Sequence, residues 1–207
     1  MSAWPGKFVI GLTGNIATGK SVVRKMLEHL GAYGIDADAL GHRAIARDAP
    51  GYKTVVDTFG RWILAPDGQV DRAKLARIVF TDPEALIQLE SIIHPLVRQA
   101  VDLLINRSTQ KAIVVEAIKL LEGPLRQACD TIWVTYAPKE VQISRLTQKR
   151  GMSVAVAHQR VNSQPPQSEK VKVANTVIHN QGSFEDTWKQ VTSAWQVLFP
   201  AYESGAY

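Results

Sequence analysis

A glycine-rich stretch near the start of the chain ends in a lysine and a serine, a combination suited to binding and transferring phosphate. Its eight residues are Gly14, Asn15, Ile16, Ala17, Thr18, Gly19, Lys20 and Ser21. They fit the pattern G-x-x-x-x-G-K-[ST], whose glycines let several backbone N–H groups point at one anion. The Lys20 ammonium can follow a phosphoryl group as it is transferred, and the Ser21 hydroxyl is a ligand for Mg²⁺. The stretch therefore predicts a phosphate-binding loop.

Three acidic residues stand where strand-like segments end, which is the edge of a parallel sheet where ligands gather. Asp36 and Asp38 close the second such segment, and Glu116 closes the third. One aspartate could accept the proton of an attacking hydroxyl while the other orients Mg²⁺-bound water. Alternatively, one of them caps a helix that starts at Ala39. Glu116 is placed for the magnesium shell, the alternative being a strand end that faces solvent.

A histidine and several arginines are further candidates for chemistry. His94 precedes Pro95 within an apolar helical pattern, and one alternative is that the proline opens a new helix there. Arg145 and Arg150 follow the fourth strand-like run, and Arg160 lies on the next helical segment. Basic helices at this place are typical of kinase lids, whose closure brings arginine onto phosphates and excludes water. Taken alone, the histidine is more typical of a structural role and each arginine of a solvated surface charge.

Alternating strand-like and helical segments must position these residues, and they predict an α/β fold with a parallel sheet. The apolar runs lack alternation, as is usual for strands that are buried on both faces. Strands are expected at residues 8–12, 33–36, 112–115, 131–135 and 176–179. No strand is evident between residues 39 and 110, so this part of the chain is expected to be a helical insertion between two strands of the sheet.

Helices are expected at residues 22–30, 72–80, 83–104 and 184–199. Asp71 and Asp82 are suited to cap the second and third of these, and Ser183 with Asp186 forms a capping box for the fourth. One face of the last helix carries five apolar residues that are expected to pack in the core. They are Phe184, Trp188, Val191, Trp195 and Leu198.

Composition excludes several classes of protein. The 207 residues are 45% hydrophobic and 21% charged, which is ordinary for one globular domain with a sizeable core. The net charge of +5 suits an anionic substrate. Because the basic residues are dispersed, no nucleic-acid partner is expected. The single cysteine, Cys129, fits a reducing cytoplasm, and no membrane-length apolar run or signal peptide is evident, so a cytoplasmic location is expected.

Over nearly its whole length the chain resembles the dephospho-coenzyme A kinases, a family of P-loop kinases. The order and spacing of several short motifs carry the resemblance. They are Gly11-Leu12-Thr13-Gly14, Gly19-Lys20-Ser21, Ile35-Asp36-Ala37-Asp38, Ile93-His94-Pro95-Leu96, Leu120-Leu121-Glu122, Arg145 with Arg150, Arg160 with Gln164, and Val177-Ile178-His179-Asn180-Gln181-Gly182. In that family the phosphate loop is richer in glycine, and Ala17 is expected to need a negative φ where glycine would be free.

The resemblance implies an α/β P-loop kinase domain over residues 1–207, with a helical acceptor-binding insertion at 39–108 and a helical lid at 139–172. It implies transfer of the γ-phosphoryl group of ATP to the ribose 3′-hydroxyl of dephospho-coenzyme A, with Mg²⁺. Its implied catalytic residues are Asp38, Lys20 and Arg145. ATP would be bound by residues 14–21 with Asn180 and Gly182, the acceptor by Asp36, Asp38, His94 and Glu122, and Mg²⁺ by Ser21 and Glu116. A monomer or weak homo-oligomer is expected.

Two alternatives belong to other kinds of P-loop protein. Another small-molecule kinase, such as a nucleoside or nucleotide kinase, would carry the same loop, and a panel of substrates distinguishes it. A GTP-dependent switch would carry an Asn-Lys-x-Asp segment that specifies guanine. The two closest candidates, the segments starting at Asn175 and Asn180, do not fit that pattern. Kinase chemistry is therefore the favoured prediction.

Overall fold

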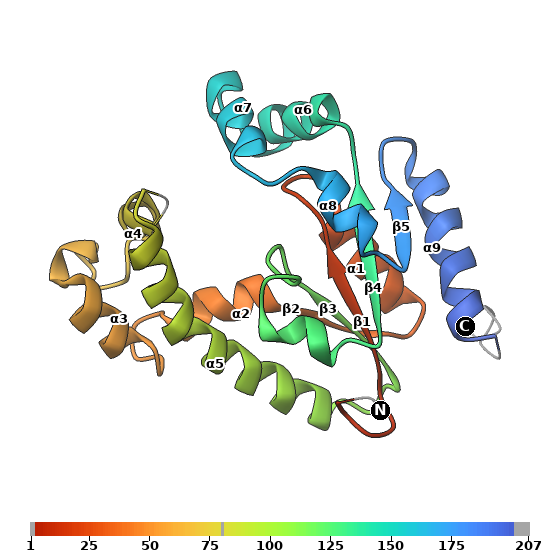
Figure 1. The fold of residues 1–207 in the computed structure, drawn as a ribbon, viewed down its shortest axis with the longest axis horizontal. Coiled ribbons are helices and arrows are strands. Elements are labelled where there is room, and N and C mark those ends of the chain that lie inside the picture. Colours follow the sequence, from red (N-terminus) through yellow and green to blue (C-terminus); the bar gives the residue numbers. More distant parts are fainter. Residues whose placement is uncertain (1–2, 80, 201–207) are drawn as a thin grey trace. The chain divides into compact units, whose positions relative to one another are not determined.

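Five strands form a single sheet in the order β2-β3-β1-β4-β5. The computed structural model describes residues 3–79 and 81–200 (Figure 1). The strands are β1 (Phe8–Thr13), β2 (Tyr33–Asp36), β3 (Ala112–Glu116), β4 (Thr131–Tyr136) and β5 (Thr176–His179). Strand β1 pairs in parallel with β3 and β4, and β4 pairs in parallel with β5. All five predicted strands are confirmed, three of them one residue longer than expected, and the loop after the central strand leaves the sheet at its carboxyl edge.

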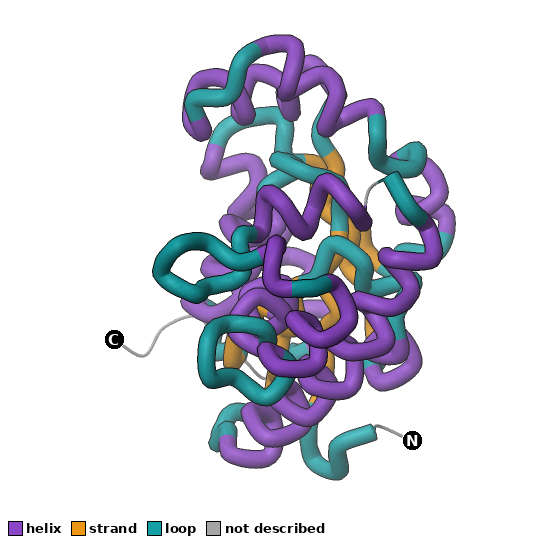
Figure 2. Tube along the Cα trace, turned by 90° about the vertical axis from the view of Figure 1, so that its left-hand side faces the viewer, coloured by secondary structure: helices purple, strands orange, loops and turns teal. Residues whose placement is uncertain are grey.

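The chain divides into two compact units, Met1–Ile35 with Ser108–Tyr207, and Asp36–Arg107. Figure 2 colours the strands orange, the helices purple and the loops teal. The helical elements of the first unit are α1 (Lys20–His29), η2 (Pro124–Ala128), α6 (Lys139–Arg150), α7 (Val154–Asn162), α8 (Gln167–Lys172) and α9 (Phe184–Leu198). None of the helices in the described part of the chain has the length and apolar character needed to cross a membrane.

Helices α1 and α9 pack together against one face of the sheet. Ile10 and Leu12 of β1 join their cluster, and Trp195 of α9 is 2% exposed within it. Gly11, between them, must face the other side because side chains alternate along a strand. A Cβ at Gly11 would lie 2.7 Å from Cys129 Sγ, so the segment around η2 covers that face closely. Both faces of β1 are therefore buried, as its continuous apolar run predicts.

The predicted apolar face of α9 packs in the core except at its first residue. Val191 and Trp195 are buried, and Trp188 and Leu198 pack against the same core. Phe184, however, is 69% exposed. It is the first residue of the helix, next to the exposed residues 181–183, so it begins the helix outside the packed region. The predicted capping box of Ser183 and Asp186 is confirmed at this same end.

The second unit is helical, with α2 (Ala37–Ala44), α3 (Tyr52–Phe59), η1 (Arg61–Ile63), α4 (Arg72–Val79) and α5 (Pro83–Arg107) around a core of its own. The predicted caps are confirmed: Asp71 Oδ1 accepts the N–H groups of Ala73 and Lys74, and Asp82 Oδ1 those of Glu84 and Ala85. The last residue of the helix predicted at 72–80 lies outside the described residues.

The helix predicted at 83–104 is confirmed as the continuous helix α5, and the alternative that Pro95 opens a new helix is wrong. Proline in a helix interior removes one backbone hydrogen bond and usually ends or kinks the helix. Here Ala85 on one side and Val97 and Val101 on the other are buried, while Pro95 itself is exposed. Packing on both sides of the proline therefore outweighs the lost hydrogen bond.

Candidate active site

The predicted phosphate loop joins the end of β1 to the start of α1, and its geometry requires glycine at two places. Gly14 and Gly19 have φ of 152° and 98°. A Cβ at Gly14 would lie 2.5 Å from the carbonyl oxygen of Thr135, and one at Gly19 would collide with the side-chain amide of Asn180. Both conformation and space therefore exclude any larger residue, and the backbone can curl tightly around an anion.

Ala17 was expected to have a negative φ, and this is wrong, since its φ is 58°. A left-handed conformation costs a residue other than glycine about 1–2 kcal/mol. Contacts on both sides hold it there: Ile16 N–H donates to Gln164 Oε1 at 2.8 Å, and Arg145 Nη1 donates to the Ala17 carbonyl at 3.1 Å. These two contacts fix the backbone on both sides of Ala17, so the alanine adopts the left-handed conformation that the loop requires.

The amino end of α1 and the Lys20 ammonium both face the loop. Gly19 is the N-cap of α1 and provides no side-chain cap, in contrast to Ser183 at α9, so no cap side chain blocks an anionic ligand at this helix end. Lys20 is only 7% exposed, and its Nζ donates to the carbonyls of Gly14 at 3.1 Å and Asn15 at 3.2 Å. A positive charge is therefore held against the loop backbone.

Glu116 lies directly beside Ser21. The Ser21 hydroxyl donates to Glu116 Oε1 at 2.8 Å, and Arg24 Nε donates to Oε2 at 2.8 Å. Glu116 is 4% exposed, so the alternative of a strand end facing solvent is wrong. Burial disfavours the charge of Arg24, but its hydrogen bond to Glu116 and the charges of Glu28 and Glu116 outweigh this and raise the Arg24 pKa. The ion pair thus holds the Glu116 carboxylate beside Ser21.

The hydroxyl and carboxylate oxygens of Ser21 and Glu116 are the hard donors that Mg²⁺ prefers. No cluster of three or more His, Cys, Asp or Glu side chains that could hold a metal occurs in residues 3–79 and 81–200. In nucleotide enzymes Mg²⁺ keeps few protein ligands, because water and the phosphates complete its shell.

Arg145 reaches from α6 to the same loop. Besides Ala17, its guanidinium donates through Nη2 to the carbonyl oxygen of Asn180 at 2.7 Å and to Asn180 Oδ1 at 3.4 Å. All of these acceptors are neutral oxygens. Burial lowers the pKa of Arg145, which means that its positive charge is poorly compensated where it stands. A guanidinium in this situation gains strongly from a phosphate oxygen.

Asn180 connects the end of β5 to the loop. Its Nδ2 donates to the Thr18 carbonyl at 2.9 Å, and its Oδ1 accepts from the Thr187 hydroxyl at 3.1 Å. The buried amide thus bridges the loop and α9. Gly182, also predicted to bind the nucleotide, is exposed and lies just before the capping box of α9. The structure brings Asn180 to the loop through direct contacts and gives none for Gly182 there.

Comparison with known proteins now identifies the family. The family model described as dephospho-CoA kinase matches residues 8–186. The chain belongs to the dephospho-CoA kinase family. The dephospho-CoA kinase of Geobacter metallireducens is 41% identical over 191 residues, which cover 91% of this chain and 95% of that relative. Both the family and the P-loop kinase fold that the sequence predicts are therefore confirmed.

Solved structures agree with this family of kinases. A Thermus thermophilus protein of known crystal structure has a TM-score of 0.81 at 30% identity, and the match covers 93% of this chain and 98% of that one. The dephospho-CoA kinase from Campylobacter jejuni has a TM-score of 0.61 at 25% identity, and the match covers 94% and 98% of the two chains.

The other four predicted residues of the dephospho-CoA kinase site lie on other elements. Asp36 is the N-cap of α2 and accepts the Ala39 N–H at 2.8 Å, and Asp38 lies in the first turn of that helix. His94 lies half-buried in α5. Glu122 is exposed on the segment between β3 and η2. The helix-capping alternative for the aspartate pair is thus confirmed for Asp36.

Sequence reasoning missed three residues that support the loop of this kinase. Arg24 holds Glu116, and the hydroxyl of Thr135, at the end of β4, lies 2.7 Å from that of Thr18. Gln164 is quoted in the family resemblance but given no role, yet it accepts the Ile16 N–H. Next to it, Asn15 Nδ2 donates to the Pro165 carbonyl at 2.9 Å. The polar end of an apolar strand could have indicated Thr135, whereas no local pattern indicates the others.

Proposed function

We propose that this chain transfers the γ-phosphoryl group of ATP to the ribose 3′-hydroxyl of dephospho-CoA, giving CoA and ADP. The observation that carries the proposal is the convergence of Lys20 and Arg145 on a curled phosphate loop in a member of the dephospho-CoA kinase family. Positioning and charge stabilisation are the main tasks of a protein in such a transfer, because little covalent chemistry falls to its side chains.

The loop and its two cations would serve the ATP phosphates. Backbone N–H groups of residues 14–21 and the open amino end of α1 would wrap the phosphate oxygens, which is supported by the absence of a side-chain cap at Gly19. Lys20 and Arg145 would neutralise charge on the transferred group. Asn180 and Gly182 would lie near the adenine.

Ser21 and Glu116 would hold Mg²⁺, which is supported by their direct hydrogen bond and by the burial of the carboxylate. The positive charge of a Mg²⁺ ion held there would offset the negative charge that develops on the transferred group. Arg24 would hold the Glu116 carboxylate in place through its own hydrogen bond.

Asp38 would orient the acceptor hydroxyl and accept its proton, with Asp36, His94 and Glu122 as further acceptor contacts. Support comes from the place of Asp38 in the first turn of α2, directly after the N-cap residue Asp36 and Ala37. Residues 39–108 would form the acceptor region and residues 139–172 the lid of one kinase domain, active as a monomer or weak homo-oligomer. The need for ATP and the single cysteine favour the cytoplasm.

A substrate panel tests the proposal. Purified protein with ATP and Mg²⁺ is expected to release ADP rapidly with dephospho-CoA and slowly with adenosine, AMP or pantothenate. Phosphorylation at the ribose 3′-position is checked by NMR of the product. Equal rates with all four acceptors, or a preference for AMP, would contradict the proposal and favour a nucleoside or nucleotide kinase.

Replacing Arg145 with alanine is expected to lower kcat more than it raises the KM for dephospho-CoA, since the guanidinium acts mainly on charge that develops during transfer. Steady-state kinetics with each substrate varied in turn measures this. Lys149→Ala is the matched control, because Lys149 is an exposed cation on the same helix. A rise in the KM for ATP alone, with kcat unchanged, would make Arg145 a ground-state contact.

A further inference from the structure

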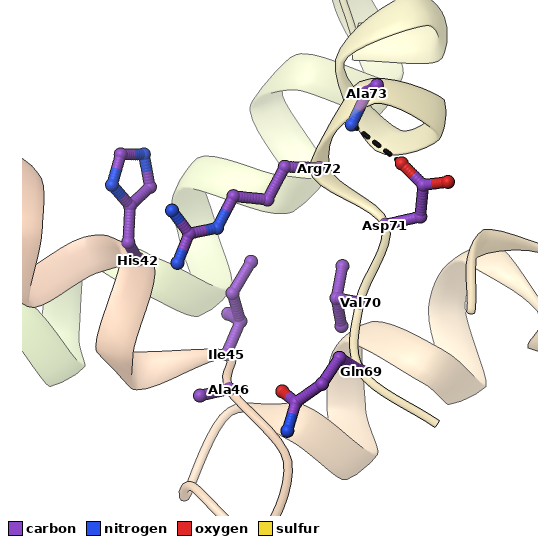
Figure 3. Close-up of a pocket in the computed structure, with 8 residues that line it drawn as sticks. All are labelled: His42, Ile45, Ala46, Gln69, Val70, Asp71, Arg72 and Ala73. Atoms are coloured by element: carbon purple, nitrogen blue, oxygen red, sulfur yellow. Dashed lines mark hydrogen bonds between the residues drawn. The ribbon is translucent and has the colours of Figure 1, made fainter. Parts of the chain in front are cut away.

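The second unit contains a cavity of about 450 Å³ whose lining includes none of the individual site residues named above. This volume is within the range of small-molecule sites. Figure 3 shows its lining, which comes from the end of α2 with the residues after it and from the segment that leads into α4. The eight residues are His42, Ile45, Ala46, Gln69, Val70, Asp71, Arg72 and Ala73.

The cavity combines an apolar floor with a cationic side. Ile45 and Val70 face each other across it, and the Arg72 guanidinium extends toward the ring of His42 (Figure 3). Both His42 and Arg72 are exposed residues. Among the described residues, neither side chain makes a hydrogen bond or an ion pair with another. The N–H donors of the Arg72 guanidinium are therefore available to a ligand in the cavity. A guanidinium can bind a phosphate group through two parallel hydrogen bonds.

The nearby carboxylate of Asp71 does not neutralise Arg72. Its Oδ1 accepts the N–H groups of Ala73 at 3.0 Å and Lys74 at 3.1 Å, so it is engaged at the amino end of α4. In Figure 3 the Asp71 and Arg72 side chains leave the backbone on opposite sides. Lys74 in turn donates to the Leu64 carbonyl. Arg72 is thus the cation that this segment presents to the cavity.

Helix α2 relates the cavity to the proposed acceptor site. Asp38 and His42 are four residues apart on this helix, so they share a face, one turn of about 5.4 Å along its axis. In dephospho-CoA the 5′-diphosphate is separated from the 3′-hydroxyl only by the ribose ring and one carbon. A ribose whose hydroxyl meets Asp38 can therefore place its diphosphate near His42 and Arg72, and the pantetheine arm next to the apolar floor.

We propose that this cavity is the subsite for the diphosphate of the acceptor and the first part of its pantetheine arm, with Arg72 as the principal diphosphate ligand and His42 as a second donor. The assignment rests on the proposed function, because it takes dephospho-CoA as the acceptor. It explains why Arg72, whose side chain has no partner among the described residues, stands beside an apolar cavity in the helical unit.

The test is a kinetic comparison of Arg72→Gln with the matched control Arg77→Gln, in which another exposed arginine of α4 that does not line the cavity is changed. Loss of the charged hydrogen bonds is expected to raise the KM for dephospho-CoA ~10- to 100-fold. The KM for ATP and kcat are expected to stay within twofold, and Arg77→Gln to match the wild type. His42→Ala, on a different helix, is expected to raise the same KM by a smaller factor.

The possible results separate the assignment from the proposed function. A wild-type chain that leaves dephospho-CoA unphosphorylated would overturn both. An active wild type with an unchanged KM for dephospho-CoA in Arg72→Gln would overturn the assignment alone. So would equal effects of Arg72→Gln and Arg77→Gln, or a fall in kcat with KM unchanged. If Arg72→Gln fails to give the circular-dichroism spectrum of the wild type, His42→Ala decides, and an unchanged KM in that variant overturns the subsite.

Discussion

Replacing Lys20 with methionine is expected to lower kcat at least a hundredfold while the chain stays folded. A cation that meets developing charge on the transferred phosphoryl group contributes on the order of 3 kcal/mol, which is about a hundredfold in rate. Methionine is a better replacement than alanine, because Lys20 is only 7% exposed and methionine preserves the buried aliphatic part of its side chain. The measurements are kcat with saturating ATP and dephospho-CoA and a thermal unfolding curve.

Some loss of stability is expected in this variant. The Lys20 ammonium donates to two loop carbonyls, and each lost hydrogen bond costs about 1 kcal/mol. Lys25→Met is the control, since Lys25 is an exposed lysine of the same helix. A Lys20→Met chain that is unfolded at the assay temperature, or one that retains more than a tenth of wild-type kcat, would contradict the catalytic role.

Replacing Asp38 with asparagine is expected to lower kcat by about 10²- to 10⁴-fold, the usual contribution of a general base. The change preserves the shape of the side chain and removes its charge and basicity. The KM for ATP is expected to stay near its wild-type value. Kinetics with each substrate varied, together with ATP binding by calorimetry, measure the two effects separately.

Asp36→Asn is the matched control for this prediction. The Asp36 carboxylate accepts the Ala39 N–H at the start of α2, and an asparagine side chain caps a helix in the same way, so the fold is expected to persist. Its activity is expected to fall less than that of Asp38→Asn and to recover in part with extra Mg²⁺. If Asp36→Asn is instead the inactive variant and Asp38→Asn stays active, the two roles must be exchanged.

The parts of the fold that could be predicted depend on chemistry between neighbours in the sequence. Continuous apolar runs identify the five strands, and Asp71, Asp82 and Ser183 identify helix starts because a cap acts within three residues. The phosphate loop could be found in the same way, since its pattern specifies both glycines. These features need no knowledge of what packs against them.

The errors arise where distant packing overrides a local rule. Ala17 adopts a left-handed conformation because Gln164 and Arg145, both more than 100 residues away, hold the peptides around it. Pro95 stays within α5 because the turns on both sides are buried. Likewise the partnership of Arg24 with Glu116 depends on how α1 lies against β3, which no local pattern encodes. Neither side chain alone indicates the other.

The contact between Asn180 and the phosphate loop has a consequence for how this protein is made. Asn180 donates to the carbonyl of Thr18, which lies 162 residues earlier in the chain, and its amide fills the space beside Gly19. During synthesis the loop leaves the ribosome long before Asn180 does, because synthesis runs from the amino end. The nascent chain must therefore wait for β5 and the start of α9 before its nucleotide loop is fully braced. Ribosome-bound chains that end before Asn180 carry every loop residue but lack this brace.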